Sequence, residues 1–148
     1  MWGIDVSRRA LEVARRNAVF HGVLGRILLL EGDLLGPVLD CAGPCLDAVA
    51  ANLPYVDEED LKSLPPEVQK EPLLALNGGP GGLGVIRRFI PQAYGALKSR
   101  GQLFLEVGLF QAEAVAQEMA GAGFEVEVEK DLAGAERFAV GRKRGNPS

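Results

Sequence analysis

The apolar run at residues 46–49 constrains the fold most, because it continues through Ala50 and Ala51 and then breaks at Asn52-Leu53-Pro54-Tyr55. A short apolar run bounded by turn residues predicts a buried strand. The proline fixes the backbone of the turn that follows it. Open α/β sheets bind ligands at the carboxyl ends of their strands. Residues 52–55 therefore predict a rigid, ligand-binding corner at a sheet edge.

Strand-like and helical patterns alternate along the rest of the chain, which predicts an α/β fold. Ser7 is the expected cap of the first helix. A long irregular segment follows Tyr55. The expected strands are residues 1–6, 26–31, 47–51, 102–107, 124–129 and 135–142, and the expected helices are residues 8–21, 86–97 (ended by Gly101) and 112–120. This order predicts one domain, residues 1–148, with a mostly parallel sheet and an antiparallel edge hairpin.

The composition is that of a globular chain, with 47% hydrophobic and 24% charged residues and a net charge of −4. No apolar run is long enough to span a bilayer and no leader pattern opens the chain, so we expect a cytoplasmic protein with no membrane partner. The negative charge argues against nucleic acid as a partner. Cys41 and Cys45 have only His21 to complete a metal site, so we expect two thiols and no metal.

Two acidic residues follow expected strands. Asp5 can accept hydrogen bonds from both hydroxyls of a ribose, as acids do in nucleotide-binding α/β folds. An acid near the start of a helix is also favoured by the helix dipole alone. Asp33 can accept from an exocyclic amine, or it can cap backbone amides in a turn. The residues by themselves leave both alternatives open.

The glycine-rich segment 79–84 matches the G-x-G-x-x-G pattern of dinucleotide-binding loops. That pattern requires a strand before the loop and a helix after it. The only candidate strand is the apolar run at residues 73–76, which is four residues long and follows Glu71-Pro72. Dinucleotide binding is therefore the weaker interpretation of this segment.

The residue types at positions 52–55 fit methyl transfer to a planar nitrogen. Such a nitrogen is a poor nucleophile because its lone pair is delocalised. A site that accepts hydrogen bonds from both N–H groups stabilises the pyramidal transition state more than the planar ground state. Such differential binding accelerates the reaction. Asn52 offers a side-chain oxygen and Leu53 a backbone oxygen. Pro54 removes a competing N–H, and Tyr55 offers a face for a planar substrate. The alternative is a strand-ending turn with a core tyrosine.

With its flanking residues, this motif resembles the class I S-adenosylmethionine-dependent methyltransferases, and more narrowly the HemK/PrmC family of release factor glutamine methyltransferases. The resemblance extends along nearly the whole chain. The matching residues are Gly3-Ile4-Asp5-Val6-Ser7, Ala10-Leu11, Ala14, Gly32-Asp33-Leu34, Asn52-Leu53-Pro54-Tyr55-Val56, Glu67-Val68, Glu71-Pro72, Ala75-Leu76, Gly78-Gly79, Gly82-Leu83, Glu106-Val107-Gly108, Gln111, Gly123-Phe124 and Lys130-Asp131-Leu132-Ala133-Gly134.

The resemblance implies a Rossmann-like sheet, S-adenosyl-L-methionine as cofactor, and a peptide-chain release factor as partner. In the family, the glutamine of a Gly-Gly-Gln tripeptide is methylated. By position, Asp5 would bind the ribose of the cofactor and Asp33 would lie by its adenine. Asn52 would face both cofactor and substrate, and residues 52–55 would hold the substrate amide.

Two departures from the family pattern modify these expectations. The usual Asn-Pro-Pro-Tyr reads Asn-Leu-Pro-Tyr here, although Leu53 retains the backbone carbonyl that the chemistry needs. The Asn-Leu-Pro-Tyr form is also familiar from rRNA adenine dimethyltransferases. An rRNA or DNA adenine substrate is therefore an alternative.

The second departure is at the amino end, where the resemblance begins at the second strand of the family. The recognition domain and the first strand with its glycine-rich loop have no counterpart. We therefore expect a truncated catalytic domain with impaired activity, because the missing strand lies centrally in the family's sheet. Its absence predicts two sheet fragments with unpaired inner edges, which favour self-association. The chain could then be a homo-oligomer, or a non-enzymatic oligomeric remnant of the fold.

Overall fold

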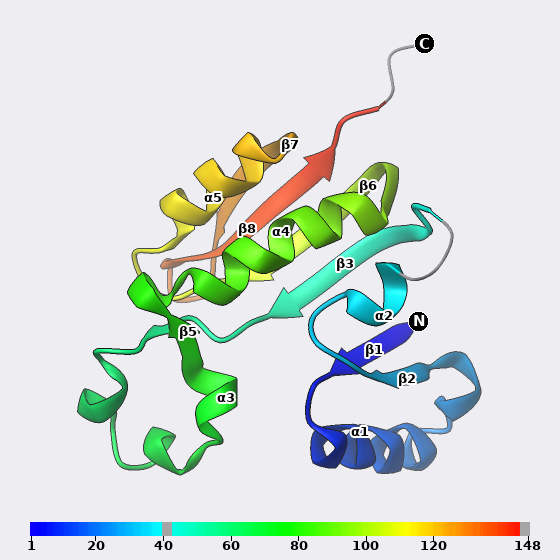
Figure 1. Ribbon diagram of the computed structural model, residues 1–148, viewed down its shortest axis with the longest axis horizontal. Helices are drawn as coiled ribbons and strands as arrows, with labels where there is room; N and C mark the ends of the chain where they lie inside the picture. The colour runs from blue at the N-terminus through cyan, green and yellow to red at the C-terminus, as the bar shows by residue number, and fades with distance from the viewer. Residues whose placement is uncertain (40–42, 146–148) are drawn as a thin grey trace. The chain divides into compact units, whose positions relative to one another are not determined.

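A computed structural model describes residues 1–39 and 43–145 (Figure 1). The chain divides into two compact units, Met1–Gly43 and Pro44–Ser148. Among the described residues, the first unit contains a two-stranded sheet and the second contains a four-stranded and a two-stranded sheet. The prediction that residues 1–148 form one domain stays a prediction.

The first unit is a β-α-β element with short helices. Its elements are β1 (Trp2–Asp5), α1 (Arg8–Phe20), the 3-10 helix η1 (Leu24–Arg26), β2 (Leu28–Glu31) and α2 (Gly36–Leu39). β1 and β2 pair in parallel, with Asp5 opposite Glu31. As predicted, Ser7 caps α1: its hydroxyl accepts a hydrogen bond of 3.3 Å from the Ala10 backbone N–H.

The second unit is organised around a four-stranded sheet in the order β3-β6-β8-β7. The strands are β3 (Leu46–Asn52), β6 (Leu97–Glu106), β7 (Phe124–Lys130) and β8 (Glu136–Lys143). β3 and β6 are parallel, whereas β8 runs antiparallel to both β6 and β7. The hairpin of β7 and β8 confirms the predicted antiparallel pair, with β8 inserted between β6 and β7.

Two helices, α4 (Gly84–Ala96) and α5 (Ala112–Gly121), lie on one face of this sheet (Figure 1). Alternate residues of β6 point to that face, so Leu103 and Leu105 are buried, as is Val107 directly after the strand. Apolar burial of this kind contributes about 1.5–3 kcal/mol for each large side chain. On the opposite face Phe104 remains 39% exposed.

The segment after Tyr55, expected to be irregular, contains only short elements. They are β4 (Val56–Asp57), η2 (Leu61–Ser63), η3 (Val68–Lys70), α3 (Leu73–Leu76), β5 (Asn77–Gly79) and η4 (Pro80–Gly82). β4 and β5 pair in parallel, so the segment leaves the corner and returns to it.

The predicted end of the long helix at Gly101 is wrong. The helix ends at Ala96, and Leu97 is extended, completely buried and paired with Leu46. Between the pairs Leu46–Leu97 and Ala48–Gln102 the register shifts, which accommodates the extra residues before Gly101. Strand pairing with β3 therefore overrides the local helical pattern.

The expected division into sheet fragments is confirmed. β1 pairs with β2 alone, and β3 pairs with β6 alone, among the residues that the structure describes. One edge of β1 and one edge of β3 are thus unpaired within residues 1–39 and 43–145.

Candidate functional site

Asn52 is the last residue of β3 and lies in register with Glu106, the last residue of β6. Its side chain is exposed and makes no hydrogen bond with another described residue. Leu53, Pro54 and Tyr55 are half-buried directly after it. The structure thus brings the four predicted residues together in one corner, with an amide group accessible at its start.

Two glycines within residues 78–84 pack against the backbone of this corner. A β-carbon on Gly78 would lie 2.8 Å from the Pro54 carbonyl oxygen, and one on Gly82 would overlap the Tyr55 carbonyl oxygen. Gly82 also has a φ of +68°, in the left-handed region that favours glycine. Glycine is required at both positions because the corner approaches them too closely for a side chain.

This packing accounts for Gly78 and Gly82, neither of which is one of the three glycines of the G-x-G-x-x-G pattern. The run at residues 73–76, which that interpretation needs as a strand, forms the helix α3 instead. The strand that does precede the loop is β5, which has three residues and pairs only with the two-residue β4 among the described strands, so it is not part of a larger nucleotide-binding sheet.

Gln111 links the corner to the loop after β6. Its Nε2 donates a 2.9 Å hydrogen bond to the Tyr55 carbonyl, and its Oε1 accepts a 3.0 Å hydrogen bond from the Gly108 N–H. One side-chain amide therefore satisfies two partly buried backbone groups from different segments. Gln111 belongs to the matching residues of the sequence, but the sequence alone suggested no role for it.

Arg137, at the start of β8, joins the side chain of Tyr55 to that of Glu106. Its Nη2 donates to the Tyr55 hydroxyl at 3.3 Å and to Glu106 Oε1 at 3.1 Å. The guanidinium carbon lies 5.6 Å from the centre of the Tyr55 ring. The hydrogen bond to Tyr55 raises the pKa of Arg137, burial opposes that rise, and Glu106 adds to it. Arg137 is therefore a permanent cation at the corner.

Asp5 and Asp33 both follow strands of the first unit at the same sheet edge, since Asp5 ends β1 and Asp33 follows β2 by two residues. Both side chains are exposed. Asp5 Oδ1 accepts a 2.7 Å hydrogen bond from the Ser7 N–H, as expected for an acid at a helix start. These two acids belong to one unit and residues 52–55 to the other.

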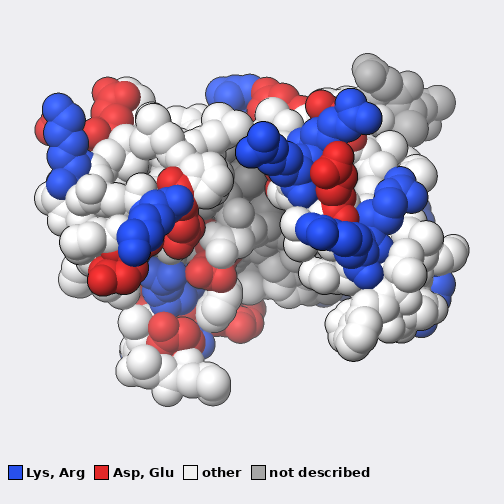
Figure 2. Space-filling model, turned by 90° about the horizontal axis from the view of Figure 1, so that it is seen from below, with Lys and Arg blue, Asp and Glu red and all other residues white. Residues whose placement is uncertain are grey.

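Other candidate sites contribute less. Within the described part of the chain, no three metal-binding side chains cluster. Cys45 is a partly buried free thiol, and Cys41 lies outside the described residues. Acidic and basic side chains are interspersed on the face shown in Figure 2. Within residues 1–39 and 43–145, no helix has both the length and the apolarity needed to cross a membrane.

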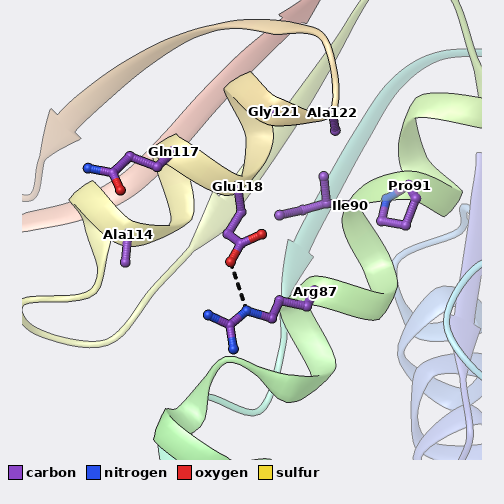
Figure 3. A pocket seen from close by; sticks show the side chains of 8 residues that line it. All are labelled: Arg87, Ile90, Pro91, Ala114, Gln117, Glu118, Gly121 and Ala122. Atoms are coloured by element: carbon purple, nitrogen blue, oxygen red, sulfur yellow. Dashed lines mark hydrogen bonds and ion pairs between the residues drawn. The ribbon is translucent and has the colours of Figure 1, made fainter.

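A groove of about 500 Å³ lies between α4 and α5 (Figure 3). Ile90 and Pro91 line its α4 side, and an ion pair of 2.8 Å between Arg87 and Glu118 spans it. None of the predicted site residues is among the residues that line this groove.

Comparison with solved structures identifies the fold. A methyltransferase from Pyrococcus furiosus superposes with a TM-score of 0.69 at 15% sequence identity, over 97% of this chain and 62% of that chain. The chain therefore has the Rossmann-like fold of the class I methyltransferases.

Curated relatives are more similar in sequence. The release factor glutamine methyltransferase of Moorella thermoacetica is 40% identical over 146 residues, which is 97% of this chain and 50% of the relative. The ribosomal protein uL3 glutamine methyltransferase of Bradyrhizobium diazoefficiens is 44% identical over 105 residues, covering 71% of this chain and 32% of the relative.

The chain is a homologue of the protein-glutamine methyltransferases. This confirms the resemblance seen in its motifs. The chain spans about half the length of the release factor glutamine methyltransferases that it matches. Methyltransferases of this fold generally use S-adenosylmethionine. No protein-family model matches the chain.

Sequence reasoning missed Arg137 as a site residue. The sequence does carry a signal for it: an expected hairpin at the carboxyl end reverses the direction of the last strand. Where a strand runs antiparallel to its neighbour, its first residues lie beside the last residues of that neighbour. A basic residue at the start of β8 is therefore placed at the edge where β3 and β6 end.

Proposed function

We propose that this chain takes part in the S-adenosylmethionine-dependent methylation of a glutamine side-chain nitrogen in a peptide-chain release factor. The accessible Asn52 amide at the carboxyl end of β3 carries this proposal. The 40% sequence identity to a release factor glutamine methyltransferase also supports the proposal. Because the chain spans half of such relatives, both the activity and the substrate are proposals for this chain.

The corner provides the acceptors that amide methylation needs. Asn52 Oδ1 and the Leu53 carbonyl would each accept one N–H of the substrate amide, and Tyr55 would pack on its planar face. As the N–CH₃ bond formed and the S–CH₃ bond of the sulfonium donor broke to leave a thioether, the nitrogen lone pair would leave conjugation, and these acceptors would stabilise the pyramidal nitrogen more than the planar one. One N–H proton leaves to solvent after transfer.

Two acids of the first unit fit the nucleoside part of the cofactor. S-adenosylmethionine supplies the methyl group as a sulfonium when it is bound. Asp5 is exposed at the carboxyl end of a parallel strand, where its carboxylate can accept from ribose hydroxyls. Asp33 is exposed beyond the neighbouring strand and suits an adenine amine. Asn52 is our third candidate contact for the cofactor.

Ribosomal protein uL3 is the second candidate substrate. It is favoured by the 44% identity to a uL3 glutamine methyltransferase, although that match covers 105 residues. Both substrates present a glutamine side chain, so the same corner chemistry applies to either. The surroundings of the glutamine, rather than the amide itself, would distinguish them.

The test is transfer of a tritium-labelled methyl group from S-adenosylmethionine to peptides containing the glutamine site of a release factor, that of uL3, or an adenine oligonucleotide. We expect labelling of a glutamine peptide, and its loss in Asn52→Ala. Asn17→Ala, an exposed change on α1, serves as the control. Labelling of the oligonucleotide alone would favour the adenine alternative.

A non-enzymatic oligomer is the remaining alternative, and the unpaired edge of β3 supports it. Asp47 is the one charged residue of that strand, and it already pairs with Lys98 at 2.8 Å. Uncharged edges favour pairing between chains. Light scattering that shows a dimer, together with no methyl transfer to any substrate, would support this alternative. A labelled glutamine would exclude it.

A further inference from the structure

We infer that Arg137 is a positioning residue for methyl transfer, which holds the ring of Tyr55 and the carboxylate of Glu106 at the substrate corner. The inference rests on the proposed function, because it assigns Arg137 a part in the binding of the glutamine amide. The Arg137 side chain connects the carboxyl-terminal hairpin to the Asn52–Tyr55 corner.

The topology brings Arg137 to this corner. β8 runs antiparallel to β6, so its first residues lie beside the last residues of β6: Phe138 pairs with Glu106. β6 in turn pairs with β3 in parallel, with Glu106 opposite Asn52. Neighbouring strands lie about 4.8 Å apart. Arg137 therefore reaches a position two strands away from its own.

Arg137 makes two hydrogen bonds through one nitrogen. Its Nη2 lies 3.3 Å from the Tyr55 hydroxyl and 3.1 Å from Glu106 Oε1, and the side chain is only 20% exposed. The planar guanidinium fixes both directions at once, whereas a lysine ammonium is a point charge on a flexible stem. Lysine at this position would therefore restore the charge without restoring the geometry.

Tyr55 is held from both ends by residues distant in sequence. Gln111 donates to its backbone carbonyl at 2.9 Å, and Arg137 donates to its ring hydroxyl. With both ends fixed, the ring keeps one orientation at the corner. A preset ring lowers the entropy lost when a planar amide packs on it. Loss of Arg137 should therefore weaken glutamine binding and leave the Asp5 side of the cofactor contacts unchanged.

The first arm of the test is spectroscopic and needs no activity. The chain contains two tyrosines, so ¹³C-labelled tyrosine gives two sets of ring signals, which Tyr55→Phe assigns. We expect Arg137→Met to shift and broaden the Tyr55 signals only. Tyr94 is the internal control for folding, because the cation over its ring is Lys143 rather than Arg137; Lys143 Nζ lies 4.4 Å from the ring centre. Arg142→Met, on the same strand and exposed, should leave both tyrosines unchanged.

The second arm is kinetic. We expect Arg137→Met to raise KM for the glutamine peptide about 10-fold, the loss of one charged hydrogen bond, with an unchanged KM for S-adenosylmethionine. Tyr55→Phe should act similarly, and the double variant should be no worse than either single one, because both remove the same contact. Arg137→Lys should recover only part of the loss.

Additive effects of the two substitutions, or Tyr55 signals unchanged in Arg137→Met, would overturn the inference. A chain that methylates nothing while its Tyr55 signals respond to Arg137→Met would sink the proposed function and leave the positioning contact intact. The two failures are therefore distinguishable.

Discussion

The Asn52–Tyr55 corner and the Asp5–Asp33 edge are built in different ways. The corner is fixed by contacts from distant segments: Gly82 packs on it, Gln111 holds its backbone, and Arg137 holds the ring of Tyr55. Asp5 has a local contact instead, with the Ser7 N–H two residues away. The corner should therefore be sensitive to substitutions far along the chain, and the acidic edge should depend on its immediate neighbours.

The largest expected effect is that of Gly82→Ala. The added β-carbon would overlap the Tyr55 carbonyl oxygen and lie 2.5 Å from Gln111 Nε2, at a φ of +68°. Backbone strain and overpacking together should lower the free energy of unfolding by about 3–4 kcal/mol. Urea denaturation followed by the tyrosine signals measures this loss.

Gly81→Ala is the matched control for this substitution. Its φ is +65°, but an added β-carbon would meet no atom within 4 Å. It should lose only about 1–2 kcal/mol from strain. Equal losses at the two positions would mean that the close packing of the corner on Gly82 contributes nothing. The corner would then not depend on distant segments more than the acidic edge does.

Gln111→Leu should have the next largest effect. The side chain keeps its approximate volume but leaves the Tyr55 carbonyl and the Gly108 N–H without their partner. An unsatisfied, partly buried backbone group costs about 1–3 kcal/mol, so we expect a loss of about 2 kcal/mol in urea denaturation. Gln117→Leu, whose exposed amide contacts only Glu113 among the described residues, should change stability by less than about 0.5 kcal/mol.

The same contrast separates what the sequence predicts from what it does not. Apolar runs such as residues 46–49 and caps such as Ser7 act locally, so β1, β2, β3, β7 and β8, with α1 and α5, follow from the residues, whereas β4, β5 and the first half of β6 do not. The end of α4 at Ala96 does not, because pairing of Leu97 with Leu46 decides it. The four corner residues follow from one motif. Arg137 is 82 residues from Tyr55 in sequence, and only the strand order reveals their contact.

Ser7→Ala tests the local character of the first unit. The hydroxyl caps α1 through the Ala10 N–H, and loss of such a cap costs about 1 kcal/mol. Trp2 is the only tryptophan of the chain and lies in β1, so its fluorescence follows the unfolding of this unit. Ser7→Asn should retain most of the stability, because asparagine also caps helices well. An equal loss in both variants would count against capping.

Asp5→Asn should have the smallest effect on stability. Asparagine keeps a side-chain oxygen that can accept from the Ser7 N–H, so the unfolding transition of Trp2 should shift by less than about 0.5 kcal/mol. Its effect on S-adenosylmethionine binding should be larger, because a charge-assisted hydrogen bond to the ribose becomes a neutral one, which is about half as strong. Calorimetry on a chain that binds the cofactor measures this difference.

Asp5→Ala is the companion variant, because it removes both the cap-like contact and the ribose acceptor. It should lose stability as well as affinity, whereas Asp5→Asn should lose affinity alone. If Asp5→Asn changed neither, the carboxylate would serve only the start of α1, and the acidic edge would be a helix-capping feature rather than a cofactor contact. That result would leave Asp33 as the one acidic candidate contact of the first unit, beside the corner in the second unit.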